Sequence, residues 1–308
     1  MRRLGTALVV AAVLALGIAA AVDALRSREA AAPALPRPPP VDRAELVASL
    51  REAGVSGVLT FADARCRLRA VTLPDLLPHP APAIRACRVP PSPGRMLRFG
   101  RPGGDPQRIV VARCRRGTVE VGPLGGRPFA RFRGCAPAWR PDGTLTAVRD
   151  GAVLELASSR VLLSRSDLAD AFSQAGWTRL DYAVEEIAWL DSETLVAIVR
   201  AGEQGRELLT VFRQGRLAAT PLVDDDLSAL RTSPDGRSAA ATGSGHVRVL
   251  ALDGRRMALP RGAVGVAWSP DERWTAVATG NGILLLGEGR GRLGVLRLPI
   301  AAADLVWR

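Results

Sequence analysis

Four cysteines are the residues whose types and spacing most directly suggest chemistry in this chain. Cys66 and Cys87 are 21 residues apart, Cys114 and Cys135 are also 21 residues apart, and the second pair follows the first by 48 residues. Paired thiols form disulfides in an oxidising compartment. The copied spacing predicts Cys66–Cys87 and Cys114–Cys135 bridges, because equivalent positions in neighbouring repeats are too far apart to be joined. Four buried free thiols are the alternative.

Residues suited to metal binding or catalysis are scarce. The chain has no Cys-x-x-Cys spacing, and only His79 and His246 could assist the cysteines as metal ligands. It also has no Gly-x-Ser-x-Gly, His-Glu-x-x-His or calcium-loop pattern. Glu186 and Asp304 occupy equivalent repeat positions and could bind a cation, although carboxylates at strand starts are commonly ordinary solvated groups. We therefore expect no enzyme activity, no cofactor and no metal.

The elements that must position these residues form a repeat. The turn sequence Ala-Trp-Arg-Pro-Asp-Gly at 138–143 returns with substitutions at 188–193, 231–236 and 267–272, and in shortened form at 91–94. Pro presets φ for a tight turn and Asp-Gly favours the following positions, so one strand ends and another begins at each copy. The positions equivalent to Trp139 are Pro91, Trp189, Thr232, Trp268 and Trp307.

The period of this repeat predicts the fold. Its spacings of 48, 50, 43, 36 and 39 residues suit one four-stranded propeller blade. Residues 57–63 and 66–71 are typical of the second and third strands of a blade, and residues 304–308 match a missing first strand. We predict an all-β, six-bladed β-propeller of four-stranded antiparallel blades, closed by the C-terminal strand. Seven blades are the alternative, since residues 61–63 could form a first strand and residues 96–107 are poorly patterned.

The N-terminal part of the chain has a different composition. Residues 4–22 carry no charge and follow Met1-Arg2-Arg3, so residues 1–25 are predicted to form a signal anchor or transmembrane helix whose N-terminus stays in the cytoplasm. A cleaved signal peptide is the alternative. A Pro-rich linker at 26–40 and a short helix at 41–56 follow, with Gly54 ending the helix. The β-propeller is expected to span 57–308.

A helical insertion at 165–184 interrupts the strand pattern. Apolar residues from Leu168 to Ala175 recur at helical spacing, and Gly176 can end the helix. Insertions on one face commonly form the binding surface of a repeat protein. The alternative is that its aromatic residues only cover the hydrophobic interior of the ring, with the acidic run beside them a polar loop. The candidate partner surface comprises Phe172, Trp177, Tyr182, Asp224, Asp225 and Asp226.

Composition agrees with one sizeable domain built of short strands, with 47% hydrophobic residues, 31 Gly and 23 Pro. All 42 basic residues are Arg, which is typical of codon bias in a GC-rich bacterial genome. The formal net charge of +12 could steer the domain towards acidic lipid headgroups, cell-wall polymers or acidic proteins. Nucleic acid is not an expected partner, because the domain is predicted to be exported and its aromatic content is 4%.

Turns of the Trp-Ser-Pro-Asp type make residues 57–308 resemble the TolB-type and WD-repeat-like bacterial propellers. Only two copies keep Ser-Pro-Asp, and the Trp-Asp and Gly-His signatures of WD repeats are missing. The resemblance implies a scaffold for protein contacts outside the cytoplasmic membrane. We therefore expect a single-pass, membrane-tethered, extracytoplasmic propeller that acts as a protein-binding or assembly module for protein partners in the cell envelope. The alternatives are a channel-sited hydrolase or small-ligand or cation receptor, and a purely structural spacer.

Overall fold

The computed structural model divides the chain into two compact units, Met1–Pro40 and Val41–Arg308. All residues that the structure describes lie in the second unit, so the predicted anchor and linker are outside them. No helix among these residues is long and apolar enough to cross a membrane. The described residues are 43–62, 67–80, 96–99, 108–123, 127–178, 180–202, 205–224, 227–242, 247–251, 259, 263–279, 282–287, 291–296 and 305–307.

The described strands form six antiparallel sheets. The first sheet has the order β24-β1-β2-β3 and contains β1 Gly57–Ala62, β2 Leu68–Leu73, β3 Leu77–His79 and β24 Val306–Trp307. The second contains β4 Met96–Phe99, β5 Arg108–Arg113, β6 Thr118–Pro123 and β7 Ala130–Arg133, with the 3-10 helix η1 Cys114–Arg116 between β5 and β6. The third contains β8 Cys135–Trp139, β9 Leu145–Arg149, β10 Ala152–Glu155 and β11 Val161–Leu163.

The remaining three sheets follow the same plan. The fourth contains β12 Tyr182–Trp189, β13 Thr194–Ala201 and β14 Arg206–Arg213, whose outer edge pairs with both β15 Arg216–Leu217 and β16 Leu222–Asp224. The fifth contains β17 Ser228–Thr232, β18 Ser238–Thr242 and β19 Val247–Ala251. The sixth contains β20 Ala263–Trp268, β21 Trp274–Thr279, β22 Gly282–Gly287 and β23 Gly291–Leu296. The prediction of an all-β fold with antiparallel sheets is confirmed, and four of the six described sheets have the predicted four strands, whereas the fourth has five and the fifth has three.

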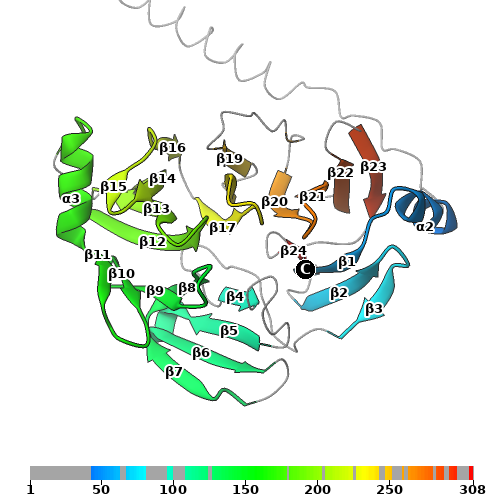
Figure 1. The fold of residues 1–308 in the computed structure, drawn as a ribbon, viewed down its shortest axis with the longest axis horizontal. Helices are drawn as coiled ribbons and strands as arrows, with labels where there is room; N and C mark the ends of the chain where they lie inside the picture. The colour runs from blue at the N-terminus through cyan, green and yellow to red at the C-terminus, as the bar shows by residue number, and fades with distance from the viewer. Residues whose placement is uncertain are drawn as a thin grey trace, which may run out of the picture. The chain divides into compact units, whose positions relative to one another are not determined.

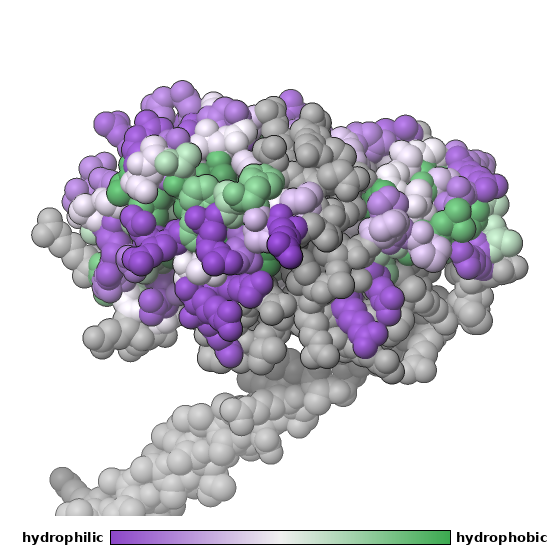
Figure 2. All heavy atoms as spheres, turned by 90° about the horizontal axis from the view of Figure 1, so that it is seen from below, coloured by the Kyte–Doolittle hydropathy of each residue, from purple (hydrophilic) through white to green (hydrophobic). Residues whose placement is uncertain are grey.

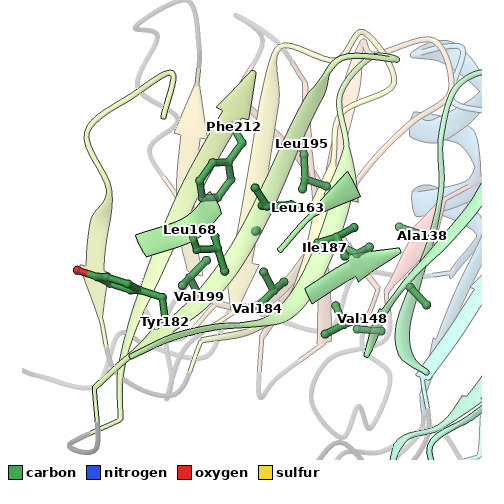
Figure 3. Packing of buried hydrophobic residues seen from close by; sticks show 14 of the residues in the cluster. Ala138, Val148, Leu163, Leu168, Tyr182, Val184, Ile187, Leu195, Val199 and Phe212 are labelled. Atoms are coloured by element: carbon green, nitrogen blue, oxygen red, sulfur yellow. The ribbon is translucent and has the colours of Figure 1, made fainter. Parts of the chain in front are cut away.

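From the sheet β8–β11 onward, each sheet packs against the one before it in the chain, largely through the first strand of the later sheet. Strand β8 packs on β5, β12 on β8, β17 on β12, β20 on β18 and β24 on β20. Figure 1 shows the same order of sheets. Buried apolar side chains fill these junctions, and the largest cluster joins the sheets β4–β7, β8–β11 and β12–β16 (Figure 3). Hydrophobic burial between sheets therefore holds each first strand in place.

The two ends of the described unit meet in one sheet. The last strand, β24, pairs antiparallel with β1, which places Trp307 opposite Leu59 and Val306 opposite Thr60. The indole Nε1 of Trp307 also donates to the carbonyl oxygen of Ser56 over 2.9 Å. The predicted pairing of the C-terminal strand with the N-terminal strands is confirmed. It covers an edge of β1 that would otherwise expose unpaired backbone groups.

The recurring Ser-Pro-Asp turn is a closed hydrogen-bond unit. The Oγ of Ser233 donates to Asp235 Oδ1 over 2.5 Å and accepts from the backbone N–H of Ser238 over 2.9 Å. Ser269 makes the same two kinds of contact in the next copy. Side-chain oxygens thus satisfy backbone donors that a two-strand turn leaves unpaired, which explains why these residue types recur there.

We call Trp139 and its five equivalent positions the marker residues of the repeat. One of the six, Pro91, was assigned wrongly. Five of the six marker residues end the first strand of a described sheet: Trp139, Trp189, Thr232, Trp268 and Trp307. In the sheet β4–β7, however, the first strand is Met96–Phe99, and Pro91 lies outside the described residues. Prolines cannot donate to a strand ladder, so Pro-Ser-Pro-Gly at 91–94 is a poor first strand and Met96–Phe99 serves instead. The alternative of seven blades needed residues 61–63 to form a first strand. Residues 61 and 62 belong instead to β1, which is the second strand of its sheet.

The helix α2, Arg43–Glu52, packs on the sheets. Leu46 and Leu50 are buried in the cluster that joins the sheets β24–β3 and β20–β23. The helix ends at Glu52, and Gly54 stops it as predicted, because its φ of +69° turns the backbone away from the helix. The N–H of Val55 then bonds to the carbonyl of Leu50, which closes the helix end. Arg51 adds an ion pair with Asp75 at 2.6 Å.

Candidate functional site

The predicted insertion contains the helix α3, Arg165–Gln174. Ser164 caps it: its Oγ accepts from the N–H of Asp167, and its own N–H donates to Asp167 Oδ2 over 2.8 Å. This capping box satisfies two backbone donors at the start of the helix. At the other end, the N–H of Trp177 bonds to the carbonyl of Phe172 over 3.0 Å. Both ends of the insertion are therefore held in one conformation.

Two aromatic residues of the candidate partner surface lie in the core. Phe172 and Tyr182 are fully buried and stack with ring centroids 4.2 Å apart. Trp177 and Phe212 meet Phe172 edge-on, at 6.0 and 6.2 Å. Figure 3 shows Tyr182, Leu168 and Phe212 within this cluster. Assigning Phe172 and Tyr182 to a partner surface was wrong, because the apolar side of α3 turns inward and its aromatic groups gain more by packing than by exposure.

The hydroxyl of Tyr182 remains hydrogen-bonded although its ring is buried. It donates to the carbonyl of Thr178 over 2.8 Å, which ties the loop after α3 to the start of β12. Burial raises the pKa of this phenol above its ordinary value. Tyr182 is therefore a neutral anchor of the insertion.

The exposed part of the insertion is different from the predicted surface. Leu180 is 46% exposed, lies over Gly202 of the β13–β14 hairpin, and was not identified from the sequence. Trp177, three residues before Leu180 in the chain, is half-buried. Arg165 forms an ion pair with Asp181 that joins the start of α3 to the end of the loop. The only sequence signal for Leu180 is a single large apolar residue in a polar loop. The exposed polar residues of α3 are Arg165, Ser166, Asp167, Asp170, Ser173 and Gln174.

The acidic run is only partly described. Asp224, at the end of β16, forms an ion pair with Arg248 of β19 and so links two neighbouring sheets. Asp225 and Asp226 lie outside the described residues. Because Asp224 forms an ion pair with an arginine of its own chain, its role in this structure is to link two sheets and not to contact a partner.

One predicted disulfide is present. Cys114 and Cys135 are bonded, with 4.8 Å between their Cα atoms, and join the turn η1 to the start of β8. The prediction for this pair is confirmed. Cys66 and Cys87 lie outside the described residues, so their bridge stays a prediction. The observed bond fixes the junction between the sheets β4–β7 and β8–β11 covalently.

Glu186 is a buried carboxylate on the first strand of its sheet. Its Oε1 accepts a hydrogen bond of 3.0 Å from the backbone N–H of Leu230, in the neighbouring sheet. Strand β17 has one extra residue between Ser228 and Arg231, and this bulge takes Leu230 out of the regular ladder. The carboxylate thus satisfies a donor that the bulge leaves unpaired.

Arg231, next to this donor, extends the same connection. Its Nη1 donates to the carbonyl of Leu230 over 2.9 Å, and its Nε donates to the carbonyl of Leu305 over 3.4 Å. Leu305 precedes β24, so the arginine joins the fifth sheet to the sheet that contains both ends of the unit. These contacts can hold first strands at fixed separations.

Within the described residues, no group of three or more His, Cys, Asp and Glu side chains could hold a metal ion. The Nδ1 of His79 lies 3.0 Å from the carbonyl oxygen of Pro80. Asp304, the predicted counterpart of Glu186, and His246 lie outside the described residues. The predicted cation site of Glu186 with Asp304, and a metal role for His79 and His246, therefore stay untested.

The chain is similar to two solved structures along most of its length. One is the β-propeller domain of Cps50 (Swd1) from Myceliophteria thermophila, with 15% identity, coverage of 80% of this chain and 87% of that one, and a TM-score of 0.47. The other is TolB from Acinetobacter baumannii, with 16% identity, coverage of 82% and 66%, and a TM-score of 0.49. No family model and no curated protein matches the chain.

Proposed function

We propose that the chain is a single-pass, membrane-tethered, extracytoplasmic β-propeller of six blades that acts as a protein-binding module in the bacterial cell envelope. Six sheets that pack in chain order, and the pairing of β24 with β1, support a closed ring of six blades. The uncharged residues 4–22 support the tether. The Cys114–Cys135 bond supports an oxidising compartment.

The α3 insertion is the observation that carries the binding role. Its caps, its aromatic stack and the ion pair between Arg165 and Asp181 hold it in one conformation. A surface that is ordered before binding loses little conformational entropy when a partner docks. The insertion presents a polar helix side together with the exposed side chain of Leu180. We define the insertion surface as Asp170, Gln174, Trp177 and Leu180.

Substitution on this surface tests the proposal. In the full-length chain, Leu180→Asp combined with Asp170→Arg should reduce the amount of partner captured from membranes by about tenfold or more, because a charge inside a desolvated contact is costly. Leu77→Asp, at an exposed apolar residue of β3, is the matched control and should capture the wild-type amount. Equal thermal midpoints would show that the variants fold. Unchanged capture by the folded double variant would overturn the insertion surface.

The location is tested separately. Protease added to the outside of intact spheroplasts should digest residues after 40, and alkaline washing should leave the full-length chain in the membrane fraction. Protection of the domain from external protease would contradict the extracytoplasmic proposal. Release by alkaline washing would contradict the tether, whatever the result of partner capture.

A further inference from the structure

The positive charge of the chain is concentrated on one sheet. Residues 108–133, which form β5 to β7, contain seven arginines and one glutamate, a net charge of +6 out of +12 for the whole chain. Residues 182–224, which form the sheet β12–β16, contain four arginines and seven acidic residues, a net charge of −3. An anionic surface would therefore be attracted to one side of the domain and repelled from another.

Strand register places Arg113, Glu120, Arg131 and Arg133 on one side of this sheet. Thr118 lies opposite both Arg113 and Arg133, and Glu120 lies opposite Arg131. Opposite residues share a side of a sheet, and so do residues two apart along a strand. The buried residues Val110, Ala112, Val119 and Val121 lie on the other side.

The single glutamate of this sheet is already neutralised. Glu120 accepts from Arg131 over 2.7 Å and forms an ion pair with Arg113 at 3.2 Å, while its own side chain is only 11% exposed. Arg131 is 68% exposed. The turn η1 adds Arg115 and Arg116, both exposed and held next to β8 by the Cys114–Cys135 bond. The surface that solvent meets here is therefore cationic.

An exposed aromatic residue lies among these arginines. Phe129 is 64% exposed and comes just before the outer strand β7; Arg127 lies two residues before it, and Arg131 and Arg133 lie two and four residues after it. Arg127 and Arg133 are also exposed. Figure 2, viewed from the side where β5 to β7 lie in Figure 1, shows strongly hydrophilic side chains gathered around hydrophobic ones. A phenyl ring offers nothing to a soluble polyanion in water, but it gains free energy by entering the boundary of a lipid bilayer.

We propose that this surface rests on an anionic lipid bilayer, with arginines at the headgroup phosphates and Phe129 inserted between them. We call it the arginine rim and define it as Arg115, Arg116, Arg127, Phe129, Arg131 and Arg133. The role goes beyond protein binding and uses a different sheet from the insertion surface. For a domain tethered to a membrane, contact at the arginine rim sets which side faces the bilayer and leaves the acidic sheet β12–β16 turned away from it.

Binding of the purified unit Val41–Arg308 to vesicles tests the proposal, because this unit contains the described cores and lacks the predicted anchor, which would bind any bilayer. Vesicles of phosphatidylcholine with phosphatidylglycerol should bind more chain than vesicles of phosphatidylcholine alone, and salt should reduce the difference. Arg115→Ala with Arg133→Ala should weaken the anion-dependent binding about 25-fold, because each arginine near the surface is worth about fivefold. Phe129→Ala should weaken it about threefold or more. Arg131 is left unchanged, since its loss would expose Glu120.

Matched controls separate the rim from general charge and folding effects. Arg216→Ala with Val223→Ala removes an exposed arginine and an exposed apolar residue from the outer strands of the sheet β12–β16, and should leave binding unchanged. Arg115→Lys with Arg133→Lys keeps the charge and should retain binding. On anionic vesicles, hydrogen exchange of the amides at 127–133 should slow in the wild-type chain and not in the alanine variant.

Three results would overturn the proposal. The first is equal binding to anionic and neutral vesicles, and the second is full binding by the folded alanine variant. The third is protection of residues 127–133 by soluble polyphosphate together with wild-type vesicle binding by Phe129→Ala, which would assign the rim to a soluble polyanion. None of these measurements involves a protein partner, so they leave the proposed protein-binding function to its own test.

Discussion

The indole Nε1 of Trp189 donates a hydrogen bond of 2.9 Å to the Oγ1 of Thr146, a residue of the preceding sheet. That hydroxyl in turn donates to the carbonyl of Ala138 over 2.9 Å. Arg140 lies over the Trp189 ring, with its guanidinium carbon 4.9 Å from the ring centroid, and bonds to the carbonyl of Ser192. Trp189 therefore links two neighbouring sheets and also ends the strand β12.

Removing the Thr146 hydroxyl should break this joint. Thr146→Val keeps the shape of the side chain but leaves the Trp189 N–H unpaired, which should lower the free energy of unfolding by about 1–3 kcal/mol. Urea unfolding followed by tryptophan fluorescence measures the change. Thr60→Val is the matched control, because Thr60 is buried at the equivalent position and its Oγ1 has no hydrogen-bond partner in the described part of the chain. That variant should be as stable as the wild type or more so, and equal losses in both would contradict the role of the bond.

We expect Glu186 to stabilise the fold as a hydrogen-bond acceptor, and not to take part in catalysis or cation binding. Glu186→Leu leaves the N–H of Leu230 unpaired and should lower the free energy of unfolding by about 1–3 kcal/mol. Glu186→Gln keeps an acceptor oxygen and should lose less. Urea unfolding ranks the variants. A Gln variant as unstable as the Leu variant would mean that the charge, and not the acceptor, is what stabilises the junction.

The strands and turns could be predicted because their signals are local. Alternating apolar residues and the Ser-Pro-Asp hydrogen bonds act within a few residues, so the ends of β8, β12 and β20 followed directly from the marker tryptophans. The copied cysteine spacing also predicted the Cys114–Cys135 bond, which joins the turn η1 to the start of β8.

The exposure and roles of the candidate site residues could not be predicted, because they depend on packing between sheets, which the repeat pattern does not specify. Helical spacing identified the apolar side of α3, but only the three-dimensional neighbours Tyr182 and Phe212 show that this side is covered. The role of Glu186 depends on a bulge in another strand, β17, that spacing alone does not predict. From the sequence, the arginine rim could be seen only as net charge, because strand register decides that Arg131 and Arg133 share a side of the sheet.

Gly236 should tolerate no side chain. Its φ is +69°, and a Cβ there would lie 2.6 Å from the carbonyl oxygen of Leu190 in the neighbouring turn. Gly143 occupies the corresponding turn of another copy with a φ of +87°, but a Cβ there would meet nothing within 4 Å. Gly143→Ala should therefore lose about 1 kcal/mol from backbone strain alone. Gly236→Ala should lose clearly more, because the backbone of Leu190 must also move. Similar losses in urea unfolding would show that the two turns are not in close contact.

Acid should weaken the turns through Asp191 and Asp142. Burial alone would raise the pKa of Asp191, but hydrogen bonds from Glu193 and Thr194 and the charge of Arg213 hold its pKa below the ordinary value. Asp142 also has a lowered pKa: partial burial opposes the shift, whereas the Thr144 bonds and Arg140 favour it. A carboxylate whose pKa is depressed by folding stabilises the fold at pH values above its unfolded pKa, and the contribution disappears as the pH falls through the folded pKa.

The free energy that Asp191 contributes to folding should therefore depend on pH. For Asp191 the contribution should be constant from neutral pH to about pH 5 and should decline below about pH 4. Asp191→Asn, which cannot ionise, should be less stable than the wild type at pH 7, and the difference should shrink on acidification as the wild-type carboxylate becomes protonated. Urea unfolding of both proteins between pH 7 and pH 3 measures it. A difference that grows towards low pH would contradict a lowered pKa and would mean that the neutral carboxyl is the form that the turn prefers.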